Sequence, residues 1–202
     1  METFIQHLPG YQVNEYKIII IPHEDLARRI MEIKKQFNQK YEVEGVSISI
    51  PQVILAHFKQ IRSAEERIIN RLRLIAMGSH PLKVEIKDYG SYPSHTIFLD
   101  IPSPSLTDLV KKIRQDSQRL MKADANNPPH FMSNGHLTIA RKLKPWQYNK
   151  AWMEYSKRHF TGKFIANNMI LVKRKPGEFK YTPVASFELM NLPVDIKQGE
   201  LF

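Results

Sequence analysis

Apolar residues follow two different periods along the chain, and the period predicts the type of each element. Alternating or continuous apolar runs bounded by turn residues indicate strands, whereas apolar residues three and four apart indicate helices with one buried face. In the first half these patterns predict strands at 16–22, 53–61, 82–89 and 95–101 and helices at 24–39 and 63–77. Ser63 and Glu66 have the spacing of a capping box for the second helix, and Gly78 follows its end.

The same order of elements starts again near residue 101. The second half is expected to contain helices at 105–121 and 145–159, a polar loop at 124–133, and strands at 135–142, 163–173 and 179–190 with Pro176 and Gly177 in the last turn. Corresponding positions lie about 80 residues apart, as Ile18 and Ile97 do. The repeat predicts a bilobal, pseudo-symmetric α+β fold in which two antiparallel-rich sheets face a central groove and helices lie outside. Residues 1–202 would form one such two-lobed domain.

The composition limits the class of protein. An apolar content of 42% in 202 residues is enough for a sizeable core. The longest aliphatic run, Ile18 to Ile21, is far shorter than the roughly 20 apolar residues of a membrane span, and the first residues lack the layout of a secretion signal. We therefore expect a cytoplasmic protein with no membrane partner. The absence of cysteine excludes disulfides, thiolate nucleophiles and cysteine-ligated zinc.

The net charge of +10 favours an anionic partner, because a positive field concentrates phosphates near the surface. A surface that is charged only for solubility would give the same value. Charge alone therefore does not separate a phosphate-binding protein from a basic α+β adaptor that binds other proteins.

Two histidines occupy matching positions in the two halves. His57-Phe58-Lys59 and His136-Leu137-Thr138 each lie on the middle strand of a half. Side chains alternate across a strand, so each histidine shares a face with the residue two positions on. If Phe58 and Leu137 pack against the helices, both histidines stand on the open faces of the sheets.

Two imidazoles across a groove are suited to phosphoester chemistry. One can take a proton from water or a hydroxyl while the other donates a proton to the leaving oxygen, and both roles need a pKa near neutrality. The hydroxyl of Thr138 could hold a phosphate oxygen. This scheme requires no metal and no other cofactor.

The segment Gly135-His136-Leu137-Thr138-Ile139-Ala140-Arg141 and its partner histidine resemble the motifs of the two-histidine (2H) phosphoesterase superfamily, which includes the 2′-5′ RNA ligase-like proteins. That family has two His-x-Thr/Ser motifs about 80 residues apart on the central strands of a bilobal fold. The resemblance implies a metal-independent phosphoesterase that acts on 2′,3′-cyclic phosphate ends of RNA, or on related 2′-5′ or cyclic-nucleotide phosphodiesters. His57 would be the base and His136 the acid, and the protein would act as a monomer on RNA or a nucleotide.

Lys59 departs from the family pattern, which has threonine or serine at this position. A lysine can bind phosphate as a point charge, and its proximity would lower the pKa of His57 and favour the base role. The alternative is a site that binds RNA or a nucleotide on the same fold and turns over little or nothing.

Further candidates lie near the two motifs. Arg141 resembles the arginine that trails the second family motif, but strict alternation places it opposite His136 and Thr138, so it reaches the groove only if the strand bends or ends there. Tyr92 and Tyr181 lie near strand ends where the family often places an aromatic residue for base stacking, although a core or surface tyrosine is the alternative for each.

The remaining charged and histidine residues have less specific interpretations. The run 173–175 at a hairpin tip is either a solvated turn or a contact for a polynucleotide backbone, in which case affinity would fall steeply with salt. Surface or capping roles are expected for the histidines that have no counterpart in the other half: His7, His23, His80, His130 and His159.

Overall fold

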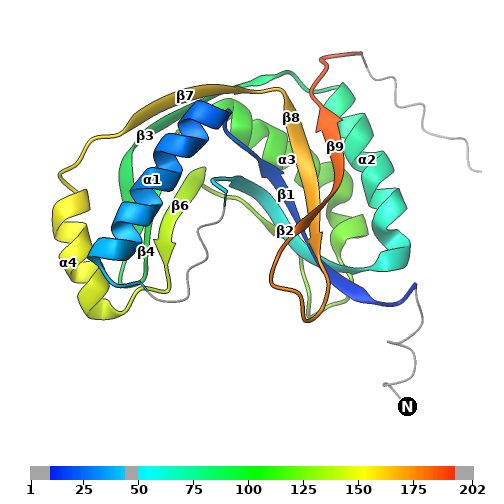
Figure 1. The fold of residues 1–202 in the computed structure, drawn as a ribbon. Helices are drawn as coiled ribbons and strands as arrows, with labels where there is room; N and C mark the ends of the chain where they lie inside the picture. Colours follow the sequence, from blue (N-terminus) through cyan, green and yellow to red (C-terminus); the bar gives the residue numbers. More distant parts are fainter. Residues whose placement is uncertain (1–9, 44–49, 194–202) are drawn as a thin grey trace, which may run out of the picture.

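Nine strands form two antiparallel sheets in residues 10–43 and 50–193, the part of the chain that this computed structural model describes (Figure 1). The first sheet has the order β5-β2-β1-β8-β9 and contains β1 (Val13–Ile20), β2 (Val53–Ile61), β5 (His130–Phe131), β8 (Asn168–Arg174) and β9 (Thr182–Glu188). The second has the order β6-β4-β3-β7 and contains β3 (Leu82–Tyr92), β4 (Thr96–Asp100), β6 (His136–Arg141) and β7 (Thr161–Ala166).

Four α-helices in the described residues cover one face of each sheet: α1 (Glu24–Lys40), α2 (Glu65–Met77), α3 (Pro104–Met121) and α4 (Pro145–Tyr155). α1 follows a strand of the first sheet but packs on β6 and β7 of the second, whereas α3 follows a strand of the second sheet and packs on β2 of the first. α2 joins α3 on the first sheet (Figure 1). The predicted α+β architecture, with helices outside two antiparallel sheets, is confirmed.

The helix ends show which local signals were correct. His23 caps α1 by accepting a hydrogen bond from the backbone N–H of Leu26 at 3.3 Å, which agrees with its expected capping role. The capping box predicted at Ser63 is wrong: residues Arg62–Ala64 form a 3₁₀ turn, and α2 begins at Glu65 without a side-chain cap. His7 lies outside the described residues.

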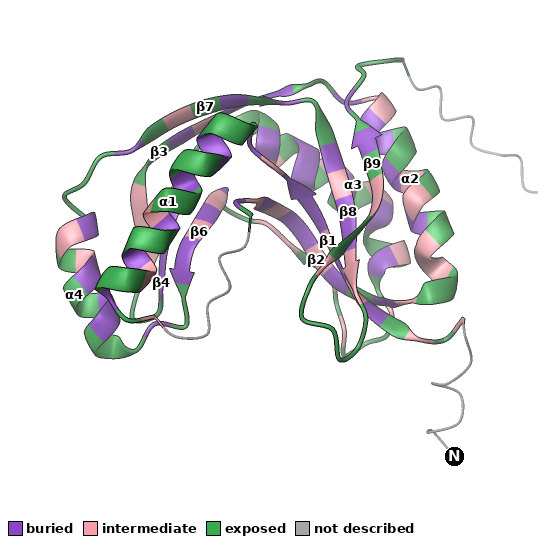
Figure 2. Cartoon of the chain, in the orientation of Figure 1, coloured by how far each residue is buried: buried purple, intermediate pink, exposed green. Residues whose placement is uncertain are grey.

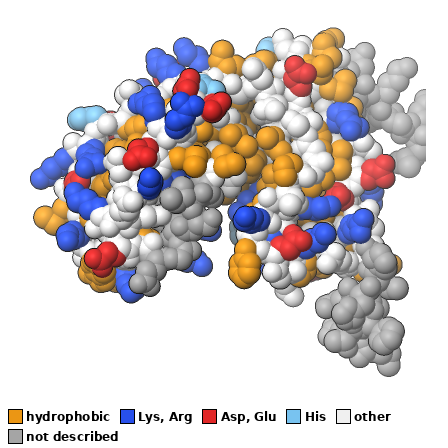
Figure 3. Space-filling model, in the orientation of Figure 1, with side chains coloured by type: hydrophobic (Ala, Val, Ile, Leu, Met, Phe, Trp, Pro, Cys, Tyr) orange, Lys and Arg blue, Asp and Glu red, His pale blue; other side chains and the backbone are white. Residues whose placement is uncertain are grey.

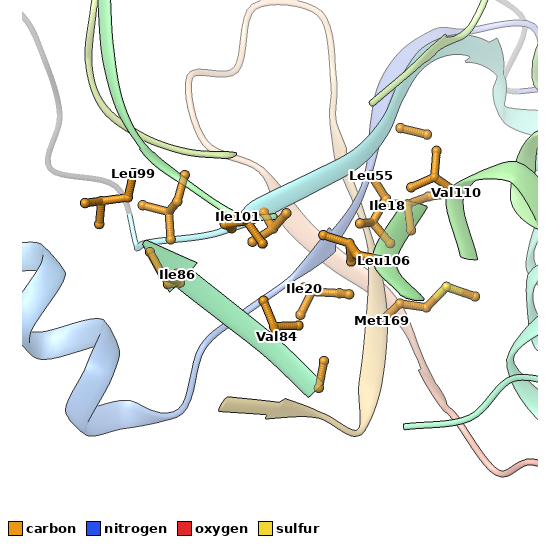
Figure 4. Close-up of a cluster of buried hydrophobic side chains, with 14 of the residues drawn as sticks. Ile18, Ile20, Leu55, Val84, Ile86, Leu99, Ile101, Leu106, Val110 and Met169 are labelled. Carbon is orange, nitrogen blue, oxygen red and sulfur yellow. The ribbon is translucent and has the colours of Figure 1, made fainter. Parts of the chain in front are cut away.

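The hydrophobic core connects both sheets. Ile18 and Leu55 from the first sheet, Val84 and Leu99 from the second, and Leu106 from α3 belong to one buried cluster (Figure 4). The helices place exposed residues outward and buried residues toward the sheets (Figure 2). The faces of the sheets that turn away from the helices are therefore left for other chemistry. Within the described ranges, no helix has both the length and the apolarity that crossing a membrane demands.

Several predicted elements differ from the structure. The single strand expected at 163–173 is two strands, β7 and β8, which belong to different sheets and are separated by Asn167. The polar loop expected at 124–133 contains β5, which pairs with β2. The last helix ends at Tyr155, and not near residue 159.

Candidate active site

His57 lies on the face of β2 that turns away from the helices. Its neighbour Phe58 is buried on the helix side, where its ring stacks on Tyr16 at a centroid distance of 5.3 Å. The imidazole of His57 is 36% exposed, and Lys59, on the same face of the strand, is exposed. The burial of Phe58 therefore determines the face that His57 and Lys59 occupy.

A carboxylate that sequence reasoning missed contacts His57. The distance from Nε2 of His57 to Oε1 of Glu15 is 2.5 Å, and the guanidinium of Arg174 hydrogen-bonds to the same carboxylate. Burial raises the pKa of Glu15, but the neighbouring Tyr181, Arg174 and His57 side chains outweigh burial and lower it to about 2. Glu15 was missed because the strand was predicted to begin at Tyr16, although alternation from Tyr16 places Glu15 on the open face.

The pKa of His57 is lowered, but Lys59 is not among the main causes, so the predicted explanation is corrected. Burial is the largest cause, Glu15 opposes it by raising the pKa, and the charges of Lys17 and His130 lower it further. His130 is exposed, as expected, but it does have a partner. It pairs in register with His57, and the two rings stack at a centroid distance of 6.5 Å.

His136 lies on the open face of β6 and is anchored differently. Its Nδ1 lies 3.0 Å from the backbone oxygen of Asn134, and among the described residues its Nε2 has no hydrogen-bond partner. The ring packs against Phe98 and Tyr92 at centroid distances of 5.1 and 5.5 Å. Tyr92 therefore lies beside His136, on the same face of the second sheet.

The glycine before His136 is required by packing. A Cβ atom on Gly135 would lie 2.6 Å from the backbone oxygen of Ile101, too close for any side chain. The backbone oxygen of Gly135 also accepts a hydrogen bond from Ile101 at 2.9 Å. Gly135 thus allows β6 to approach the segment after β4 closely at the residue where His136 enters the sheet.

A β-bulge brings Arg141 to the same face as His136. Thr138 pairs with Phe98 and Ala140 with Ile97, so one extra residue lies between them on β6. The extra residue shifts the alternation by one position, so that Thr138 and Arg141 share the open face. The expectation that strict alternation places Arg141 on the opposite face is wrong for this reason.

Arg141 links the open faces of the two sheets. Burial lowers the pKa of Lys17 on β1, and the charge of Arg141 lowers it further; burial raises the pKa of Tyr181, and the charge of Arg141 opposes that rise. β2 and β6 also contact each other. The open faces therefore border one groove, and Figure 3 shows the molecule hollowed between its two halves.

Tyr181 belongs to the charged group around Glu15. The ammonium of Lys17 lies 3.9 Å from the centroid of its ring, and the guanidinium of Arg174 lies 5.0 Å from it. The first sheet and the loop after β8 thus contribute to the groove the carboxylate of Glu15, the cations Lys17, Lys59 and Arg174, and the aromatic ring of Tyr181. Among the residues described, no three His, Asp or Glu side chains are grouped as a metal site would need.

The fold is shared with solved structures of low sequence identity. LigT of E. coli, crystallised with 3′-AMP, has a TM-score of 0.59 and 16% identity over 88% of this chain and 98% of LigT. TT0787 of Thermus thermophilus has a TM-score of 0.62 and 16% identity over 87% of this chain and 98% of its own. A structure described as a phosphoesterase has a TM-score of 0.58 and 14% identity over 87% and 98% of the two chains. A comparison with curated proteins found no match.

These structures define a class of two-sheet α+β proteins to which the present fold conforms. The sequence model of the 2′-5′ RNA ligase superfamily matches residues 22–178. The chain belongs to this superfamily of 2H phosphoesterases.

Proposed function

We propose that the protein is a metal-independent phosphoesterase acting on 2′,3′-cyclic phosphate ends of RNA, or on related 2′-5′ or cyclic-nucleotide phosphodiesters. The observation that carries the proposal is a pair of histidines on the open faces of two sheets, each with one ring nitrogen anchored and the other left for a ligand. Membership of a superfamily of phosphoesterases and ligases supports an enzyme of this kind.

Hydrolysis of a cyclic phosphate would use the two histidines in opposite roles. Neutral His57 takes a proton from water as the water oxygen forms a bond to phosphorus. Protonated His136 donates a proton to the 2′ or 3′ oxygen of the ribose as the bond from that oxygen to phosphorus breaks. The two histidines then exchange protons with solvent, and in ligation their roles would be reversed. The lowered pKa of His57 favours the neutral base at physiological pH.

The groove offers several groups for a phosphate. In this proposal the Thr138 hydroxyl and the cations Lys59 and Arg141 bind non-bridging phosphate oxygens. Tyr92 and Tyr181 stack on the bases. LigT has been crystallised with 3′-AMP and with NADP+, which supports a nucleotide ligand here. Because both histidines come from one chain, we expect the protein to act as a monomer, and we infer that it works in the cytoplasm with no cofactor.

A second candidate function is binding of RNA or a nucleotide without turnover. Lys59 favours it, because the family uses threonine or serine at that position. A basic adaptor that binds only proteins would, in contrast, have no affinity for phosphate.

The test is turnover of an oligonucleotide that ends in a 2′,3′-cyclic phosphate, measured with a chelator present. The parent protein should be active, and His136→Ala should reduce kcat by about 100-fold or more, the usual contribution of a general acid. His159→Ala is the matched control, because that side chain is 88% exposed and is not part of the groove. Equal rates for parent and His136→Ala, or a requirement for added metal, would contradict the mechanism, and phosphate binding without turnover would support the second candidate.

A further inference from the structure

The two candidate catalytic histidines are anchored through different ring nitrogens. His136 is held through Nδ1 by a backbone oxygen at 3.0 Å, so its Nε2 is left for a ligand. His57 is held through Nε2 by Glu15 at 2.5 Å, so its Nδ1 is left instead. The pseudo-symmetric halves therefore do not present equivalent atoms to the groove.

The surroundings of Glu15 determine which partner in this contact carries the hydrogen. The Glu15 side chain is 19% exposed, the guanidinium of Arg174 hydrogen-bonds to its second oxygen, and Tyr181 lies beside it. With a pKa of about 2, Glu15 is ionised at neutral pH and can only accept hydrogen bonds. The hydrogen between the two groups must therefore be on Nε2 of His57.

We propose that Glu15 is a positioning residue that holds His57 as the Nε2–H tautomer, so that Nδ1 of His57 and Nε2 of His136 exchange protons with the substrate. The proton exchange rests on the proposed function, whereas the anchoring of His57 by Glu15 does not. Glu15 touches neither the substrate nor the reacting atoms, and acts by orienting the ring and by stabilising the imidazolium that forms when His57 takes a proton.

Arg174 completes this arrangement. It pairs in register with Glu15 across β1 and β8, and its guanidinium lies 5.0 Å from the Tyr181 ring centroid. Arg174 thus fixes the carboxylate on the side away from His57. The titratable and charged groups around His57, in direct contact or through Glu15, are Glu15, Lys17, Lys59, His130, Arg174 and Tyr181.

Glu15→Gln removes the negative charge and keeps the shape of the side chain. Glu65→Gln is a matched control, because Glu65 is 18% exposed and is likewise bound by a cation of β8, Lys173, and by a tyrosine hydroxyl, that of Tyr16. Tyr16 is buried on the helix side of the sheet, so the Glu65 group does not face His57.

The anchoring is tested without reference to activity by ¹⁵N NMR of the histidine rings across a pH titration. In the parent protein, His57 should be the Nε2–H tautomer. In Glu15→Gln this preference should be lost and the pKa of His57 should fall, because the carboxylate raises it. Glu65→Gln should leave the tautomer and the pKa of His57 unchanged. An Nδ1–H tautomer in the parent, or an unchanged pKa in Glu15→Gln, would overturn the inference.

The catalytic consequence is tested by the pH profile of kcat/KM for a cyclic-phosphate-ended oligonucleotide. Glu15→Gln should move the acidic limb to lower pH and reduce kcat at neutral pH by roughly tenfold or more with little change in KM. Glu15→Asp should restore part of the parent profile. If the NMR result holds but the profile does not move, the proton-exchange half of the inference is wrong. If the parent is inactive, the proposed function fails and NMR still decides the role of Glu15.

Discussion

Lys59 separates the two candidate functions at the scale of a single residue. It is exposed on the open face of β2, where it pairs in register with Glu15, and it is not among the main causes of the lowered pKa of His57. In the proposed function, the role left for Lys59 is that of a cation for the phosphate. We therefore expect it to contribute to binding and not to proton transfer.

Lys59→Thr should raise KM for a cyclic-phosphate-ended oligonucleotide by roughly fivefold, which corresponds to about 1 kcal/mol for an exposed charge, and should change kcat little. Lys83→Thr, which replaces another exposed strand lysine, provides the control. Steady-state kinetics at fixed salt measure both parameters. A higher turnover in Lys59→Thr would instead indicate an enzyme that lost activity when lysine replaced threonine.

Residue alternation predicted part of the site and missed part of it. It placed His57 and Lys59 opposite the buried Phe58 because that signal lies within one strand. Glu15 required the correct start of the neighbouring strand, and His130 required recognition of a two-residue strand in a polar loop. Partners on adjacent strands depend on register, which the sequence of either strand alone does not specify.

At the scale of elements, the bulge in β6 decides where Arg141 lies. Periodicity cannot detect one extra residue, because Ile139 and Ala140 are both apolar and both buried. At the crossing from β7 to β8, the structure shows buried positions shifting from even residues, such as Phe164, to odd residues, such as Met169, on either side of Asn167. That change of phase marks the point where the chain leaves one sheet for the other.

The bulge predicts a binding role for Arg141. Arg141→Ala should weaken binding of inorganic phosphate by roughly tenfold, since a charged hydrogen bond contributes about 1.5–3 kcal/mol. Because the Arg141 side chain is exposed, its removal should leave the free energy of unfolding nearly unchanged. Lys142→Ala is the control, because the adjacent residue is also exposed. Calorimetric titration and urea denaturation measure the two quantities. Equal affinities for the two variants would remove Arg141 from the site.

At the scale of the molecule, the repeat predicted the two sheets but not how they are joined. β1 pairs with β2 as β4 pairs with β6, in agreement with a duplicated unit. Each unit nevertheless packs its first helix on the sheet of the other, and long-range packing of that kind has no periodic signal. The halves also differ in charge: His57 pairs with Lys17, whereas His136 pairs with Asp100. This difference gives the two histidines distinct electrostatic surroundings within one pseudo-symmetric fold.

Part of the positive charge behind the net value of +10 lies in the loop between β8 and β9, beside an exposed aromatic ring. Phe179 is 95% exposed and lies between Glu178 and Lys180 in the sequence, and Tyr181 of the groove follows Lys180. Hydrophobic and basic side chains lie close together beside the hollow in Figure 3. An exposed ring beside a cation fits a single-stranded polynucleotide, whose bases stack and whose phosphates need positive charge.

We therefore expect kcat/KM for an oligonucleotide that ends in a cyclic phosphate to fall steeply with salt. Phe179→Ala should lower this kcat/KM by about fivefold or more, because one stacked base contributes roughly 1–3 kcal/mol. A 2′,3′-cyclic mononucleotide, which lacks the neighbouring bases that would stack on Phe179, should be hydrolysed equally by the parent protein and by Phe179→Ala. Trp146→Ala is the control, since Trp146 is 51% exposed on α4, outside the groove. An equal loss for both substrates would indicate damage to the groove, and no loss for either would show that the loop does not contact the polynucleotide.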